Sequence, residues 1–237
     1  MENPPQAGNP PAGSGVGVLD KAVELVQLLA TRRSATPHEL AAAAGLPRPT
    51  VYRLLAALEA HALVERSEPG GYRLGVRVLE WAAAVTGTSQ LIQAARPVLS
   101  ALTDETGESA QLYLRQGTAR ICALASERPS GLRDTVPVGV LLPLDRGSGG
   151  KVFLAFESED ASGELARIRR QGWAATVAER EPGVASVSAP VLDAGGHLIA
   201  VISVSGPVER FGRHPGSRFA SSVVRAAATL AGRVRSC

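Results

Sequence analysis

The chain has 237 residues, of which 45% are hydrophobic and 4% aromatic, with a formal net charge of +3. This length suits one large domain or two small ones with aliphatic cores. No apolar run is long enough for a membrane span, and no signal peptide is recognisable. The two cysteines, Cys122 and Cys237, lie far apart. We therefore expect no disulfide framework and a reducing, cytoplasmic compartment.

The N-terminal stretch opens with residues 1–15, whose Pro, Gly, Asn and Ser content predicts a disordered tail. Apolar residues then recur at helical spacing and predict a first helix over 18–31. In the following "TPHELAAAAG", Thr36 and Glu39 have the spacing of a capping box, and Pro37 suits the first helical position. Gly45 is placed to end this short helix.

The stretch "LPRPTVYRLL" (46–55) predicts a third helix that starts at about Pro49, because proline is tolerated in a first helical turn and disfavours the α region at Arg48. Its apolar residues form one stripe, and Arg53 points away from that stripe. "LVERSEPGGYRLG" then predicts two short strands around a turn. Residues 16–75 therefore predict a winged helix-turn-helix that binds DNA.

Bulk charge adds little to this interpretation, because residues 17–80 hold eight basic and seven acidic residues. DNA binding therefore depends on where individual side chains stand. The candidate DNA-binding residues are Arg48, Pro49, Thr50, Tyr52, Arg53 and Arg73. A trihelical unit that never touches DNA, with solvated surface arginines, is the alternative.

The rest of the chain divides into a predicted linker and dimerisation helix over 76–94 and a second domain over 95–237. Pro97 is expected to kink or restart the helix that opens this domain. Hairpins are predicted at Gln116–Gly117 and around 193–196, helices within 147–156, 163–173 and 217–235, and a short strand at "VLLPL". Hairpins dominate, so the fold class is α+β with an antiparallel sheet.

Catalytic and metal-binding patterns are poor. "RGSGGK" (146–151) lacks the spacing of a phosphate loop, and Val152 follows Lys151 where a magnesium-binding hydroxyl is needed. The glycine-rich helix start could instead hold a carboxylate. The four histidines show no metal-ligand spacing. We therefore predict no enzyme activity, no metal and no cofactor.

Serines alternate with apolar residues on two neighbouring predicted strands, at Ser186, Ser188, Ser203 and Ser205. One interpretation is a polar face of the sheet. The other is a pocket whose small hydroxyls bind a small polar ligand. The pattern alone leaves both open.

The motifs together resemble the IclR family of bacterial transcriptional regulators, over nearly the whole chain from about Val16. The likeness is carried by "LAAAAGLPRPTVYRLLAALEAHALVER", "ARPVLSALTDETGES", "GKVFLAF" and "EREPGVASVSAPVLDAGGHLIAVISVSGP". Three segments, "TGESAQLYLRQG", "SGLRDTVPVG" and "REPGVASVSAPV", look most like an actinobacterial branch linked to leucine biosynthesis and amino-acid-dependent growth.

The resemblance implies a winged helix-turn-helix with its recognition helix at 48–60, a linker helix, and a GAF-like effector-binding domain. It implies a homodimer or homotetramer that binds a double-stranded DNA operator and a small organic or amino acid, in the cytoplasm and near the nucleoid, with no membrane partner. The effector-binding residues that it implies are Leu142, Ser148, Gly149, Thr176, Val184, Ser186, Ser203, Val204 and Ser205. The competing hypotheses are an enzyme with a helix-turn-helix appendage and an interaction module that binds no DNA.

Overall fold

The structure, a computed structural model, describes residues 14–159 and 162–235. It divides after Thr88 into an N-terminal and a C-terminal unit, each with its own core. Most of the predicted disordered tail, residues 1–13, lies outside the described residues. Over the described ranges, no helix has both the length and the apolar character that crossing a bilayer requires.

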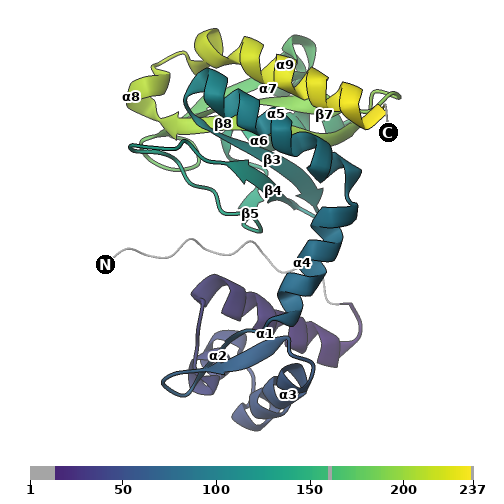
Figure 1. Cartoon of the computed structure of the whole chain (residues 1–237), viewed down its shortest axis with the longest axis vertical. Helices are drawn as coiled ribbons and strands as arrows, with labels where there is room; N and C mark the ends of the chain where they lie inside the picture. The colour runs from purple at the N-terminus through teal and green to yellow at the C-terminus, as the bar shows by residue number, and fades with distance from the viewer. Residues whose placement is uncertain (1–13, 160–161, 236–237) are drawn as a thin grey trace. The chain divides into compact units, whose positions relative to one another are not determined.

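The N-terminal unit consists of three helices, a two-stranded wing and a further helix (Figure 1). The elements are α1 (Gly17–Arg32), α2 (Pro37–Ala44), α3 (Arg48–Ala60), β1 (Val64–Ser67), β2 (Gly71–Leu74) and α4 (Arg77–Thr88). Backbone hydrogen bonds between Ala35 and Tyr72 join the wing to the segment that precedes α2. Leucines of α1, α2 and α3 form the core, with Tyr72 as its aromatic member. The predicted winged helix-turn-helix is confirmed.

The predicted caps of α2 are confirmed. The Thr36 hydroxyl accepts the backbone N–H of Glu39 at 3.3 Å, and the Glu39 carboxylate accepts the backbone N–H of Thr36 at 2.7 Å. Gly45 ends the helix in the left-handed conformation, with φ of +63°. The helix α2 is therefore fixed at both ends, and Gly45 begins the short turn that leads to α3.

The start of α3 differs slightly from the prediction. The helix begins at Arg48 rather than Pro49, because the carbonyl of Pro47 accepts the backbone N–H groups of Thr50 and Val51 at 2.9 and 3.2 Å. Pro49 thus lies in the first turn, where a missing N–H costs nothing.

Thr36→Ala is expected to lower the free energy of unfolding of the N-terminal unit by about 1 kcal/mol, since it removes the capping hydroxyl. Urea unfolding followed by circular dichroism measures this loss. Thr31→Ala, an exposed threonine in the last turn of α1, is the matched control and is expected to change stability by less than about 0.5 kcal/mol. An equal loss in both variants would show that the capping box contributes nothing.

The helix that the sequence predicted over 76–94 is interrupted in the structure. The helix α4 ends at Thr88, and α5 (Gln90–Thr106) starts after Ser89, whose hydroxyl accepts the backbone N–H of Ile92 at 3.4 Å. Residues 90–94 thus open α5, and Ile92 is buried there. Pro97 lies within α5 without ending it. Gly87 stays helical within α4, and the Ser89 cap sets the position of the interruption.

The C-terminal unit is built on one antiparallel six-stranded sheet in the order β5-β4-β3-β8-β7-β6. The strands are β3 (Ser109–Gln116), β4 (Ala119–Ser126), β5 (Leu141–Pro143), β6 (Ala174–Val177), β7 (Val184–Leu192) and β8 (Leu198–Pro207). The helices are α6 (Gly147–Glu157), α7 (Gly163–Gln171), α8 (Val208–Phe211) and α9 (Pro215–Arg235), besides α5. The predicted α+β class and hairpins are confirmed, whereas β6 and α8 were not predicted.

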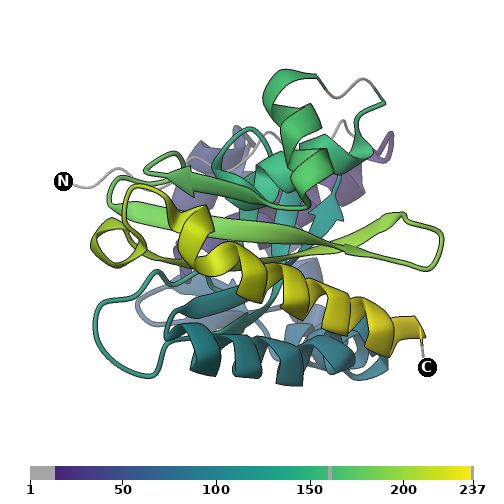
Figure 2. The ribbon, with the colours of Figure 1, turned by 90° about the horizontal axis from the view of Figure 1, so that it is seen from above.

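The two faces of the sheet differ in chemistry. Helices α5 and α9 run side by side over one face, whose residues join an aliphatic core with Ile202 and Val204 (Figure 2). Helices α6 and α7 lie on the other side, over a smaller core that includes Tyr113 and Phe153. Because side chains alternate along a strand, Ser203 and Ser205 point to the α6 side, next to Gln111 of β3. This second face carries the polar residues.

Candidate functional site

The exposed face of α3 holds most of the predicted DNA-binding side chains. Pro49, Tyr52 and Arg53 are exposed, Tyr52 to 57%, and Thr50 is half-buried. The leucine stripe behind them is buried against α1 and α2. The sequence therefore builds a helix with an apolar inner side and an outward side of hydrogen-bonding groups.

Two of these arginines have different surroundings. The guanidinium of Arg48 lies 2.7 Å from Nδ1 of His38 on α2, so it is held against the preceding helix. Arg53 makes no hydrogen bond or ion pair with any part of the chain that the structure describes. An uncompensated guanidinium on a helix surface is available to a phosphate or to a guanine edge.

The arginines of the wing are already paired. Arg73 lies 2.6 Å from Glu65 on the opposite strand, and Arg66 lies 3.1 Å from Glu59 of α3. The carboxylate of Glu59 raises the pKa of Arg66. The Arg66 guanidinium also lies over the Tyr72 ring, 5.6 Å from its centre. Arg73 must therefore release or share the Glu65 carboxylate before it can contact a phosphate.

A cluster of hydroxyls lies on the polar face of the sheet, beneath the start of α6. The Ser148 hydroxyl is 2.7 Å from those of Ser186 and Ser188, and Ser188 donates to Ser203 at 2.9 Å. Thr176 accepts the backbone N–H of Ser148 at 3.0 Å. All of these side chains are buried except Ser186, which is half-buried. The cluster is thus a connected network that joins β6, β7 and β8 to one helix terminus.

Most of the effector residues implied by the resemblance meet in this network. Ser148, Thr176, Ser186 and Ser203 are joined by hydrogen bonds, and Ser205 donates to Gln111 beside them at 3.2 Å. The network also includes Ser188, which the sequence placed on the serine strands but not among the effector residues, and it lies beside Gln111, which the sequence did not single out.

The remaining implied residues lie at the margin or elsewhere. Val184 is at the first position of β7, and Leu142 lies on the edge strand β5 paired with Arg120. Val204 points to the opposite face and is fully buried in the core under α5 and α9. The structure therefore separates Val204 from the hydroxyls, because neighbouring residues of a strand face opposite sides.

Two arginines that the sequence did not suggest reach the same end of α6. Arg120 of β4 is 2% exposed, and its guanidinium lies 5.3 Å from the centre of the Tyr113 ring. Arg180 pairs with the buried carboxylate of Asp134 at 2.5 Å. Burial lowers the pKa of Arg120 to about 10 and raises the pKa of the Tyr113 hydroxyl. Arg120 stays charged at neutral pH and Tyr113 stays neutral.

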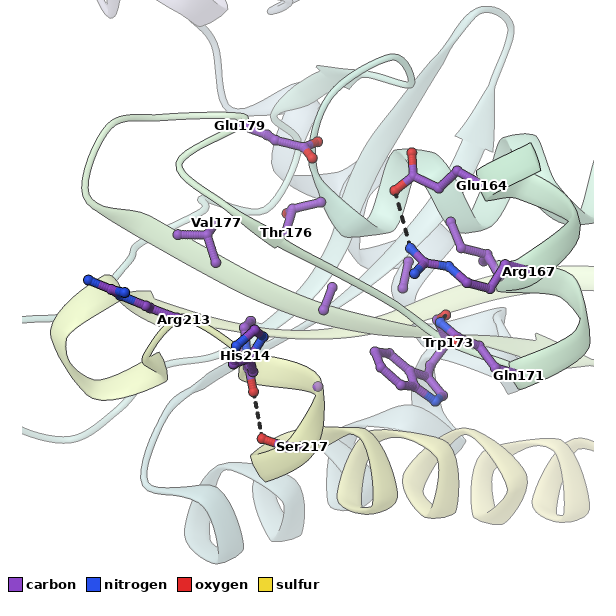
Figure 3. A pocket seen from close by; sticks show the side chains of 15 residues that line it. Glu164, Arg167, Gln171, Trp173, Thr176, Val177, Glu179, Arg213, His214 and Ser217 are labelled. Atoms are coloured by element: carbon purple, nitrogen blue, oxygen red, sulfur yellow. Dashed lines mark hydrogen bonds and ion pairs between the residues drawn. The ribbon is translucent and has the colours of Figure 1, made fainter. Parts of the chain in front are cut away.

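A separate open cavity of about 280 Å³ lies at the outer edge of the sheet, between α7, β6 and the start of α9 (Figure 3). Trp173, Arg213 and His214 contribute to its wall, and Thr176 is the one residue that it shares with the hydroxyl network. Figure 3 shows charged side chains of both signs around it, with Glu164 paired to Arg167 at 3.8 Å. In the described part of the chain, no three His, Cys, Asp or Glu residues gather as metal ligands.

Comparisons with known proteins agree with this architecture. A family model described as the IclR helix-turn-helix domain matches residues 18–68, and one described as the bacterial transcriptional regulator IclR C-terminal domain matches 83–164 and 157–231. A winged helix-turn-helix joined to such a sheet domain defines a DNA-binding transcriptional regulator. The chain belongs to the IclR family.

Curated relatives cover most of both chains. The chain is 29% identical to the transcriptional regulator BhcR of Paracoccus denitrificans, over 91% of this chain and 86% of the relative. It is 26% identical to the transcriptional repressor IclR of Escherichia coli, over 94% and 92%. These matches extend the family assignment over both units.

Solved structures show the same fold. An IclR regulator from Alicyclobacillus acidocaldarius superposes with a TM-score of 0.81 at 22% identity, over 92% of this chain and 98% of that one. An IclR homologue from Microbacterium hydrocarbonoxydans, solved with 4-hydroxybenzoate, gives 0.78 at 20% identity, over 93% and 100%.

Proposed function

We propose that the chain is a homo-oligomeric regulator that binds an operator through α3 and responds to a small acid or amino acid held in the C-terminal unit. The outward face of α3 carries the proposal, because Arg53 and Tyr52 stand exposed on a buried leucine stripe. The N-terminus of α3 adds the positive end of a helix dipole, which favours a phosphate. In this proposal Arg48 and Arg53 contact phosphate or guanine, Thr50 and Tyr52 contact base edges or backbone, and Arg73 contacts flanking phosphates.

Self-association is supported by the apolar surface of α4. Leu79, Trp81 and Val85 are 69%, 56% and 62% exposed, and Val18 and Leu19 of α1 are 61% and 53% exposed. Exposed apolar groups in this density mark an interaction surface rather than a solvated one. A two-fold dimer places two recognition helices on half-sites about one helical turn of DNA apart. Such a regulator acts at the chromosome, in the nucleoid.

Trp81→Glu combined with Val85→Glu is expected to convert the oligomer to monomer, because the change places two charges in one i, i+4 stripe of the proposed interface. Sedimentation equilibrium at micromolar concentration measures the mass. Ala228→Glu, on the exposed side of α9, is the control and is expected to leave the mass unchanged. A double variant with the wild-type mass would place the interface elsewhere.

The C-terminal unit is proposed to bind the effector at the hydroxyl network and the start of α6. Small hydroxyls and the positive end of a helix dipole suit a small polar anion. The homologue solved with 4-hydroxybenzoate shows that one protein of this fold takes a carboxylic acid. The three segments quoted above favour the leucine-linked actinobacterial branch, and hence control of amino-acid metabolism. The effector alters DNA affinity only if it binds two arrangements of the regulator unequally.

The test is a titration with the purified protein of labelled DNA from upstream of the chain's own gene, in which fluorescence anisotropy reports binding. We expect affinity about 1,000-fold or more above that for unrelated DNA of equal length. Adding branched-chain amino acids and keto acids one at a time reveals the effector as a shift in that affinity. Equal affinity for both DNAs would favour a non-DNA interaction module, and an unchanged affinity with every acid would contradict the effector part.

A further inference from the structure

Arg120 is buried without an anionic partner, although its charge is costly to bury. One terminal guanidinium nitrogen donates to the carbonyl of Pro143, and the guanidinium lies over the Tyr113 ring. No carboxylate of the described residues comes within ion-pair distance of Arg120. Its Nε is the one buried side-chain nitrogen or oxygen, within 14–159 and 162–235, that lacks a hydrogen-bond partner. Native proteins rarely leave such a group unsatisfied.

The charges around Arg120 do not pair with its own: the carboxylate of Asp145 favours the charged state of Arg120, but from beyond ion-pair distance. Arg180 lies close enough to affect the charged state of Arg120, but its own charge is matched by Asp134 at 2.5 Å. The N-terminus of α6 adds the partial positive charge of a helix dipole. A buried guanidinium without a counter-charge destabilises a fold unless something else supplies the negative charge.

The glycines at the start of α6 leave space beside this guanidinium. A methyl group on Gly147 or Gly149 would lie 3.4 Å from a guanidinium nitrogen, and at Gly149 that nitrogen is Nε. The same point beside Gly149 lies 3.5 Å from the Tyr113 ring and 3.6 Å from the Ser188 hydroxyl. Because Gly149 has no side chain, no Cβ covers the unpaired Nε on this side, next to the ring and the hydroxyl.

We propose that Arg120 is the residue that recognises the acid group of the effector, with a carboxylate oxygen that accepts the unpaired Nε–H on the side that Gly149 leaves uncovered. This inference rests on the proposed effector function and specifies its chemistry: the ligand is a small carboxylic acid in its ionised form. The hydroxyl network at Ser148, Ser186 and Thr176 then contacts the remainder of the ligand. Arg180 is not the recognition group, because Asp134 already pairs with it.

The experiment compares acids with their neutral amides on the full-length protein. The probes are acetate, pyruvate, 4-methylpentanoate and 4-hydroxybenzoate, each beside its amide, and inorganic phosphate. Calorimetric titration gives the affinities, and thermal unfolding gives the stability of each unliganded variant. We expect at least one acid to bind the wild type about tenfold or more tightly than its amide.

Three variants separate recognition from structure. Arg120→Gln is expected to lower the affinity for that acid by about 30-fold or more, since a buried charged contact is lost. Gly149→Ala keeps the guanidinium and fills the space beside it, with contacts of ordinary length, so it is expected to fold and to lose the acid. Gly232→Ala, where an added methyl meets nothing within 4 Å, is the control and is expected to bind like the wild type.

A purely structural arginine would behave differently. Arg120→Met is expected to keep or raise the melting temperature of the unliganded protein, because it removes an uncompensated charge; a lower melting temperature would contradict the proposal. Equal acid affinity in the wild type and Arg120→Gln would overturn the role of Arg120 and leave the effector function standing. Amides or phosphate bound as tightly as the acids, or no acid bound at all, would overturn the carboxylate class. The operator titration tests the regulator function independently.

Discussion

Replacing Arg48 and Arg53 together by alanine is expected to weaken operator binding by about 2–6 kcal/mol, which is about 30-fold or more. Arg53 stands exposed on α3, and it has no carboxylate partner among the residues described. Arg48 is oriented by His38 at 2.7 Å. Each guanidinium that reaches a guanine edge contributes about 1–3 kcal/mol, and the loss of each guanidinium that reaches a phosphate reduces the salt dependence of binding by about one released counterion. Fluorescence anisotropy at two salt concentrations measures both quantities.

The controls for this variant use arginines with different surroundings. Arg115→Ala, in the C-terminal unit and 3.3 Å from Glu157, is expected to leave operator affinity unchanged. Arg73→Ala is expected to have a smaller effect than Arg53→Ala, since Arg73 already pairs with Glu65 at 2.6 Å. Unchanged affinity in the double arginine variant, with an unchanged melting temperature, would favour the interaction module that binds no DNA.

Local chemistry made the N-terminal unit predictable from sequence. Thr36, Pro37 and Glu39 specify a helix start through contacts within four residues, and Gly45 specifies its end through its own backbone freedom. The leucine stripe of α3 then determines which side faces the core. The error at the start of α3 was one residue, because the Pro47 carbonyl rather than Pro49 sets the first helical hydrogen bond.

The C-terminal site was predictable in part, since strand alternation shows which serines share a face but not what lies above them. The network at Ser148 depends on α6 meeting β6, β7 and β8, which are brought together by the sheet order. The strand β6 itself has only four residues, so its pattern was too short to recognise. Val204 was carried over from the resemblance, and alternation alone places it on the opposite face from Ser203.

Arg120 illustrates a limit of a different kind. In the sequence it is one arginine at the start of an apolar strand, "ARICALAS", and the usual expectation is a solvated side chain. Its burial comes from pairing with the short strand β5 and from the glycines of α6 above it. Both partners are more than 20 residues away in the chain, so no local pattern reports the contact.

Arg210→Ala is expected to lower the free energy of unfolding of the C-terminal unit by about 3 kcal/mol. The carboxylate of Glu108 is 2% exposed, and Arg210 donates two hydrogen bonds to it, at 2.6 and 2.7 Å. Arg210 also donates to the carbonyl of Leu132 at 2.8 Å. Removing Arg210 leaves a buried carboxylate whose remaining ion-pair partner is Arg128 at 3.6 Å. Guanidinium chloride unfolding followed by circular dichroism measures the loss.

A second substitution shows whether the buried charge causes that loss. Glu108→Gln removes the charge but keeps the size of the side chain, so adding it to Arg210→Ala is expected to restore part of the lost stability. Additive losses of stability in the double variant would mean that Arg210 acts by packing alone. The control is Arg115→Ala, which removes a surface ion pair and is expected to lower the free energy of unfolding by about 1 kcal/mol or less. The difference between the two arginines follows from the burial of their partners, because Glu157 retains water at a side-chain exposure of 33% whereas Glu108 does not.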